Sequence, residues 1–217
     1  MIKEKKHQVH NLIILDESGS MESIKKPIIS GFNELVQSIK GIEKKFPEQE
    51  HYITFVTFNS AGRKVVHFMD PVAKLKKINS ATYKPDEMTP LYDAMGTSIT
   101  SLRNGIEKQT DYNVLVTVLT DGLENSSKEY TGNAIRKMVE KLKMEGWTFT
   151  YIGTEHDVES VATSISITNV MYFEKDSGGV REMFERERNA RANYSQRIRN
   201  KENTDNDFYT PDEPKKS

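Results

Sequence analysis

The sequence predicts an α/β protein with a doubly wound, mostly parallel sheet of six strands, one antiparallel edge strand and helices on both faces. Three observations lead to this prediction. Short apolar runs alternate with longer stretches of helical period, which is typical of a parallel sheet flanked by helices. Runs such as LIIL from Leu12 and VLVTVL from Val114 are apolar on both faces, as expected of central strands. A short segment with a glycine separates the second and third runs, which favours a hairpin at the sheet edge.

Each expected strand is a short run rich in branched and aromatic residues. These runs cover residues 9–16, 51–59, 63–70, 113–121, 148–154 and 169–173. The segment NSAGR, which begins at Asn59, joins the second run to the third, so these two strands should pair antiparallel.

Three helices are expected because apolar residues recur every three or four positions between the predicted strands. The apolar stripes cover residues 24–42, 91–106 and 135–142. Thr89 and Pro90 precede the second stripe, and we expect Thr89 as its N-cap and Pro90 as its first helical residue.

The composition changes near Ser177 and divides the chain into three parts. Residues 1–176 should form the folded domain. Residues 177–201 are rich in arginine and glutamate, so we expect one helix, packed on the domain or extending from it, whose charges form a solvated face of i,i+4 pairs. Residues 202–217 contain two prolines and few apolar anchors, and should form a flexible tail.

Composition narrows the classes of function. Charged residues make up 29% of the chain and cancel to a formal net charge of −1, so no overall field favours nucleic acid or an anionic membrane. The chain has no cysteine, which excludes disulfides, thiolate zinc sites and cysteine nucleophiles. The first residues, MIKEKKHQVH, lack the apolar core of a signal peptide, and no run approaches the ~20 apolar residues of a membrane span. We therefore expect a cytoplasmic protein.

Polar residues follow two of the expected central strands. Asp16 ends the first strand and Asp121 ends the fourth, and in a parallel sheet the carboxyl ends of neighbouring strands share one edge. The helix after Thr89 must begin at that same edge in order to lead back into the fourth strand. Two carboxylates and several hydroxyls can therefore meet there.

Oxygen donors of this kind suit a hard divalent cation. Ser18 and Ser20 can point the same way as Asp16 in a tight loop, and Gly19 gives that loop freedom to bend. Mg²⁺ prefers about six oxygen ligands and keeps some water, and Mn²⁺ or Ca²⁺ accepts similar donors. An ion held by only two carboxylates should bind a further carboxylate from outside. Asp93, one turn into its helix, is expected to fix a loop rather than hold the ion.

Three motifs occur in order along the chain: D-x-S-x-S from Asp16, T-P-L-Y-D-A from Thr89, and L-T-D-G followed by ENSS from Leu119. Together they resemble the von Willebrand factor A (vWA) family and its metal-ion-dependent adhesion site, over about residues 8–175. The resemblance implies a Rossmann-like fold, a bound Mg²⁺ and a partner whose acidic side chain completes the coordination. The compact size is similar to bacterial or phage cytoplasmic members. The resemblance implies these metal ligands, direct or through water: Asp16, Ser18, Ser20, Thr89 and Asp121.

The leading interpretation is a non-enzymatic module that binds a protein partner through the metal and an Asp or Glu of that partner. One alternative is an Mg²⁺-dependent phosphoryl-transfer enzyme, but such phosphatases resemble D-x-D-x-[TS] and use the second acid as proton donor, where this chain has Ser18. Neither G-x-x-x-x-G-K-[ST] nor G-x-S-x-G occurs. Another alternative is an assembly scaffold with a purely structural metal site. The sequence leaves the partner and the oligomeric state open.

Overall fold

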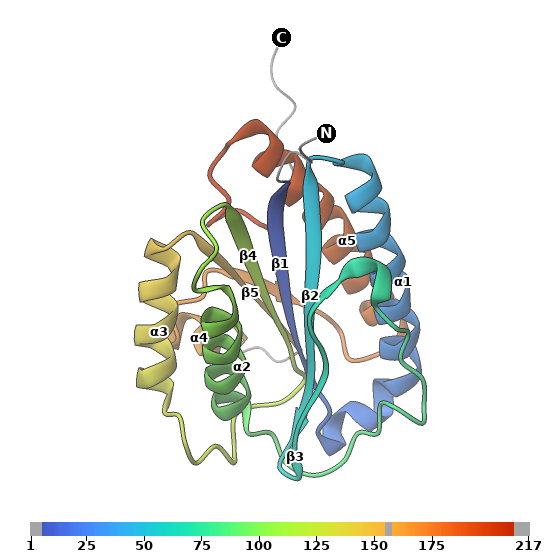
Figure 1. The fold of residues 1–217 in the computed structure, drawn as a ribbon. Helices are drawn as coiled ribbons and strands as arrows, with labels where there is room; N and C mark the ends of the chain where they lie inside the picture. Colours follow the sequence, from blue (N-terminus) through green and yellow to red (C-terminus); the bar gives the residue numbers. More distant parts are fainter. Residues whose placement is uncertain (1–5, 155–157, 211–217) are drawn as a thin grey trace.

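The computed structural model describes residues 6–154 and 158–210, which form one six-stranded sheet with helices on both faces (Figure 1). The strands are β1 (His7–Asp16), β2 (Gln49–Asn59), β3 (Gly62–Pro71), β4 (Tyr112–Leu119), β5 (Trp147–Gly153) and β6 (Asn169–Tyr172). The helices are α1 (Lys25–Lys45), α2 (Leu91–Ile106), α3 (Gly132–Met144), α4 (Val158–Ser164) and α5 (Ser177–Asn200), with short 3₁₀ turns η1 (Gly19–Ile24) and η2 (Val72–Lys74).

The strand order confirms the predicted fold class. The sheet has the order β3-β2-β1-β4-β5-β6, with β3 antiparallel to β2 and every other neighbouring pair parallel. The chain leaves β1 toward β2 on one side and later returns to β4 on the other side. The strand order therefore reverses at β1 and β4, which is where an open α/β sheet forms its ligand crevice.

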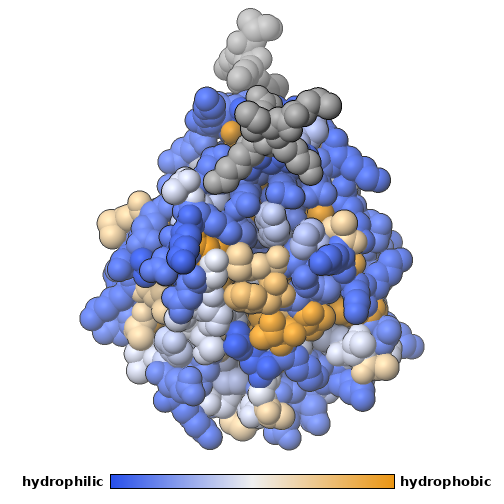
Figure 2. Space-filling view, viewed as in Figure 1, coloured by the Kyte–Doolittle hydropathy of each residue, from blue (hydrophilic) through white to orange (hydrophobic). Residues whose placement is uncertain are grey.

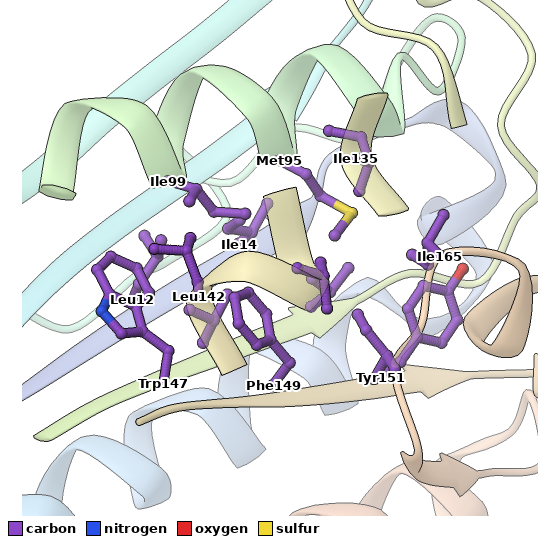
Figure 3. Close-up of a cluster of buried hydrophobic side chains, with 14 of the residues drawn as sticks. Leu12, Ile14, Met95, Ile99, Ile135, Leu142, Trp147, Phe149, Tyr151 and Ile165 are labelled. Atoms are coloured by element: carbon purple, nitrogen blue, oxygen red, sulfur yellow. The ribbon is translucent and has the colours of Figure 1, made fainter. Parts of the chain in front are cut away.

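Alternate residues of the central strand serve opposite faces of the sheet. Leu12 and Ile14 of β1 face the layer of α2, α3 and α4, and Figure 3 shows them packed with Met95 and Ile99 of α2. The intervening residues of β1, such as Ile13, face α1 and α5. Both faces of β1 are thus buried, which explains its continuous apolar run.

The six predicted strands and four predicted helices are all present, with ends shifted by a few residues. Helix α4 was not predicted. It has only seven residues, and Val158 and Ala162 are its buried positions, so its apolar pattern is too short to stand out.

Edge strand β3 carries an exposed apolar patch. Val65, Val66 and Phe68 are each more than 40% exposed, and Figure 2 shows apolar side chains gathered over this part of the molecule. The pairing of β3 with β2 is interrupted twice by irregular register, and Lys64 is exposed at the edge. Bulges and edge lysines both discourage the pairing of an edge strand with a foreign strand.

Helix α5 is held to the sheet by a buried ion pair, so the prediction of a solvated charged face is wrong for its inner side. Arg191 and Glu187 are 2% and 1% exposed, and Nε of Arg191 donates to Glu187 at 2.8 Å. The same guanidinium donates to Asn11 of β1 at 2.8 Å and to Thr117 of β4 at 2.7 Å. Asn11 and Thr117, which are polar residues of two central strands, therefore accept hydrogen bonds from the charged guanidinium of α5.

Helices α5 and α1 also pack closely on each other. Gly31 of α1 lies against the ring of Phe184, which is 2% exposed, and a Cβ at Gly31 would lie 2.0 Å from that ring. A larger residue at position 31 would therefore have to push α5 away from α1.

Residues 202–210 fold back onto the domain, whereas the sequence predicted a flexible tail from residue 202. Phe208 is 3% exposed and packs near Tyr194, with ring centroids 5.8 Å apart. The hydroxyl of Tyr209 donates to Glu187 at 2.9 Å. These two aromatic residues are the anchors that the prediction undervalued. The rest of the expected tail, 211–217, lies outside the described residues.

The amino end of β1 and the segment after α5 lie together at one end of the molecule. His7 and Thr204 both hydrogen-bond to Asn113 at the start of β4, at 2.8 Å and 3.4 Å. The carboxyl ends of β1 and β4 lie at the opposite end, toward the bottom of Figure 1. Among the helices of the described residues, none has a stretch both long and apolar enough to cross a bilayer.

Candidate metal centre

The carboxyl ends of β1 and β4 bring two of the predicted site loops together. Leu15 pairs with Leu119, so Asp16 and the residues after Leu119 leave the sheet side by side. We call this end of the sheet the rim: it comprises the loop 16–20, the loop 87–90 and the loop 120–125.

Asp16 is fully buried, and both of its carboxylate oxygens accept hydrogen bonds. Oδ1 accepts the backbone N–H of Ser18 at 2.7 Å, and Oδ2 accepts the hydroxyl of Thr120 at 2.6 Å. The hydroxyl of buried Tyr83 donates to the backbone carbonyl of Asp16 at 2.7 Å. The first oxygen donor of the rim is therefore fixed in position from three directions.

A chain of hydroxyl contacts joins the first loop to Asp121. The hydroxyl oxygens of Ser18 and Ser20 are 3.1 Å apart, and Ser20 donates to Oδ1 of Asp121 at 2.6 Å. Ser18 and Asp121 are buried, whereas Ser20 is exposed. A hydroxyl that donates its hydrogen to a carboxylate keeps its lone pairs free for a cation.

Thr89 lies beside the same hydroxyls. A Cβ at Gly122 would lie 3.5 Å from the hydroxyl oxygens of both Ser20 and Thr89, so these two oxygens flank Gly122. The backbone of Thr89 is held by Asn125, whose side chain accepts the Thr89 N–H at 2.9 Å. All five predicted site residues thus belong to one rim.

The expected N-cap role of Thr89 is wrong. The cap position of α2 is Pro90, and no side chain of that residue caps the helix. The first N–H groups of α2 are instead accepted from the neighbouring loop: Tyr92 donates to Glu124 at 2.9 Å, and Asp93 donates to the hydroxyl of Ser127 at 3.0 Å. The hydroxyl of Thr89 is therefore not used by the helix.

Asp93 fixes the loop after β4, as predicted. Its carboxylate accepts the backbone N–H groups of Lys128, Glu129 and Tyr130 at 2.7–2.9 Å. These bonds, together with the burial that opposes them, leave the pKa of Asp93 below its usual value. Loops 87–90 and 120–130 are consequently interlocked through α2.

The electrostatics of the rim favour an added cation. Burial raises the pKa of Asp16 to about 6, hydrogen bonds from Thr120 and Ser18 oppose the rise, and the nearby charge of Asp121 adds to it. The charged form of Asp16 is therefore costly unless a positive group lies near. A divalent ion meets this need, and the donor set of two carboxylates and three hydroxyls fits Mg²⁺.

Carboxylates alone do not make this site. Within residues 6–154 and 158–210, no three side chains of His, Cys, Asp or Glu cluster closely enough to hold a metal ion by themselves. The hydroxyls of Ser18, Ser20 and Thr89 would have to supply the remaining protein ligands.

Sequence reasoning missed three residues that shape the rim. Thr120 orients Asp16, and its place next to Asp121 was an available signal. Tyr83 comes from a loop with no motif, and the ammonium of Lys175 lies 2.7 Å from Oδ2 of Asp121. No pattern in the sequence connects Lys175 with the rim.

An open cavity of about 840 Å³ adjoins the rim. It is lined by the tip of the β2–β3 hairpin, the start of α2 and the loop after β4, including Met88, Pro90 and Asn125. Met88 and Leu123 are 49% and 47% exposed. The surface around the rim thus offers apolar contacts as well as polar ones.

The fold and this rim define a doubly wound α/β domain with oxygen donors at its switch point. The von Willebrand factor type A domain family matches residues 12–186, and the chain belongs to this family. No curated protein sequence matches the chain.

Solved structures with the same fold include a pilus adhesin and a minor pilin, both longer than this chain. A pilus adhesin, SpaC from Lactobacillus rhamnosus GG, is 13% identical with a TM-score of 0.60, over 88% of this chain and 30% of that one. A PilB minor pilin variant from Streptococcus sanguinis is 12% identical with a TM-score of 0.56, over 91% of this chain and 64% of that one. The SpRpn10 VWA domain is 8% identical with a TM-score of 0.51, over 82% and 94%. At these identities the likeness concerns the fold alone.

Proposed function

We propose that the chain is a non-enzymatic, metal-dependent protein-binding module. A Mg²⁺ ion at the rim would bind an Asp or Glu side chain of a protein partner. The observation that most supports this is the meeting of oxygen donors from three separate loops beside a carboxylate that burial leaves in need of a cation. The proposed ligands, direct or through water, are Asp16, Ser18, Ser20, Thr89 and Asp121.

Each residue of the rim has a separate task in this proposal. Asp16 brings negative charge, and Thr120 and Ser18 hold its oxygens in place. Ser20 links the ion site to Asp121 by its hydroxyl hydrogen. When bound, Mg²⁺ supplies a positive charge that accepts a carboxylate oxygen from outside the chain.

The surface around the rim supports a protein as partner. The cavity of about 840 Å³ and the exposed side chains of Met88 and Leu123 can accept residues on either side of an acidic anchor. A small anion would use none of this surface.

Calorimetry with the metal alone tests the first half of the proposal. MgCl₂ titrated into the chain should show one binding site, and Asp16→Asn should remove it because the buried charge is lost. Asp111→Asn is the matched control: Asp111 lies at the opposite end of the sheet, bonded to His7 at 2.7 Å, and its loss should leave metal binding unchanged. Equal metal binding by the wild type and Asp16→Asn would contradict the proposal.

Capture of partners from cell extract tests the second half. The wild-type chain in Mg²⁺ should capture a set of proteins from the extract. The wild-type chain in EDTA and the Asp16→Asn variant should both fail to capture this set. Binding that survives EDTA would count against metal dependence. Phosphate release from p-nitrophenyl phosphate by the purified chain would support the phosphoryl-transfer alternative instead.

The scaffold alternative is tested on the outer face of α5. Truncation there would remove buried residues such as Phe184 and unfold the domain, so surface substitutions are preferable. Loss of partner capture in an Arg181→Ser and Arg186→Ser variant that still binds Mg²⁺ would favour a scaffold. The cytoplasmic location remains a prediction, which cell fractionation tests.

A further inference from the structure

A lysine contacts the rim from a part of the chain outside the three motifs. Nζ of Lys175 lies 2.7 Å from Oδ2 of Asp121, whose side chain is fully buried. Oδ1 of the same carboxylate accepts the hydroxyl hydrogen of Ser20 at 2.6 Å. Among the described residues, no donor makes an aligned hydrogen bond to Oδ2. The lysine therefore pairs with this oxygen by charge and proximity.

The backbone on both sides of Lys175 is fixed. Phe173 is 3% exposed, and its N–H donates to the carbonyl of Gly153 at 3.0 Å. Asp176 is the N-cap of α5 and accepts the N–H of Gly179 at 2.8 Å. The turn between β6 and α5 thus presents Lys175 to the rim without freedom to move away as a whole.

The side chain of Lys175, in contrast, can leave. The side chain is 37% exposed, and its ammonium lies at the end of a flexible four-carbon stem. The ammonium can therefore rotate toward the solvent without any change in the backbone. Asp121 cannot follow it, since the hydroxyl of Thr154 donates to the Asp121 carbonyl at 2.9 Å and the carboxylate is buried. Separation of this pair is a movement of the lysine alone.

The lysine and a divalent ion would compete for the same charge. A cation held near Asp121 would lie within a few ångströms of the ammonium, where two positive charges repel strongly in a partly buried site. We propose that Lys175 is an internal counter-ion of the rim, which the divalent ion must displace from Asp121, and that it thereby sets the metal affinity. This inference rests on the proposed metal-binding function.

Metal titrations of a lysine variant test the competition. In low-salt buffer, Lys175→Met should bind MgCl₂ or MnCl₂ about tenfold more tightly than the wild type, which corresponds to about 1.4 kcal/mol. Lys175→Arg keeps the charge and should stay close to the wild type.

A matched control separates this local effect from the general loss of one positive charge. Lys64 also pairs with a buried carboxylate, that of Glu17 next to Asp16, at 2.8 Å. Lys64→Met removes the same charge beside the first loop of the rim but breaks no contact with Asp121, and it should change the metal affinity less than twofold. An equal gain in Lys64→Met and Lys175→Met would overturn the inference.

Thermal unfolding gives a second readout. In EDTA, Lys175→Met should melt below the wild type because Asp121 loses its counter-ion, and Mg²⁺ should raise the Tm of the variant more than that of the wild type. If the wild type binds metal and Lys175→Met binds it equally or more weakly, the inference is wrong while the proposed function stands. If neither protein shows metal binding, either by calorimetric titration or by a shift in Tm, both the inference and the proposed function are wrong. If only Lys175→Met binds, the lysine wins the competition and the inference holds.

Discussion

Helix α1 contains two glycines that one added methyl group should affect in opposite directions. Gly31 faces α5, where a Cβ would lie 2.0 Å from Cδ2 of the buried Phe184 ring. Gly41 lies on the exposed side of the same helix, where a Cβ would meet nothing within 4 Å. Replacing each glycine by alanine therefore separates helix preference from packing.

The structure sets the size of both effects. Alanine is better than glycine in a helix interior by about 0.8–1 kcal/mol, so Gly41→Ala should raise the free energy of unfolding by about that amount. Gly31→Ala gains the same preference but forces a methyl group into a packed interface, which costs about 1–3 kcal/mol. Because the Phe184 ring is 2% exposed and would have to shift within a packed interface, we expect the upper part of this range. The net loss should be about 1–2 kcal/mol, leaving the two variants about 2–3 kcal/mol apart.

Urea unfolding at equilibrium measures the difference, since a change of midpoint at constant slope reports stability. A partial recovery by Phe184→Leu in the Gly31→Ala background would locate the strain at this contact. If Gly31→Ala proves as stable as Gly41→Ala, the close packing of α1 on α5 is refuted.

Three further predictions concern the rim, the helix α5 and the segment that follows it. Burial raises the pKa of Asp16 to about 6, so the folded state holds this proton more tightly than the unfolded chain; without divalent ions, stability should fall as pH rises from about 4 to 6. Asp16→Asn should flatten that slope in urea titrations with EDTA, and an unchanged slope would exclude Asp16 as its source. Arg191→Met should lower the free energy of unfolding by about 3–5 kcal/mol because Glu187 stays buried without its partner, and adding Glu187→Leu should recover much of the loss. No recovery in the double variant would speak against the pairing. Phe208→Ala should cost about 3–5 kcal/mol in the same assay, whereas a loss below about 1 kcal/mol would mean that residues 202–210 add little to the fold.

The sequence was most informative where one physical rule acts along a short stretch. The strand at Leu12 is continuous and apolar because both of its faces are buried, and the rule that parallel strands end at one edge placed Asp16 near Asp121. The prediction of the α2 N-cap failed because the first N–H groups of α2 are accepted by Glu124 and Ser127, which lie more than thirty residues further along the chain. Local pattern does not contain such a contact.

The prediction that the charges of α5 are solvated failed on its inner face for a related reason. Arg191 looks like one of many surface charges on a helix, and only the structure brings it over the sheet. A signal was nevertheless present, because Asn11 directly precedes the apolar run LIIL of β1 and Thr117 interrupts the apolar run VLVTVL of β4, and both residues are buried. Polar interruptions of a buried strand indicate that a polar partner arrives from another element. For Lys175 no comparable signal exists.

The described ends of the chain, near His7 and Thr204, share the pole of the molecule opposite the rim. A tether, tag or neighbouring domain joined at either end would therefore hang from the far side and leave the carboxyl ends of β1 and β4 facing outward. Immobilisation through one end should orient every copy on a sensor chip with this surface toward the solution.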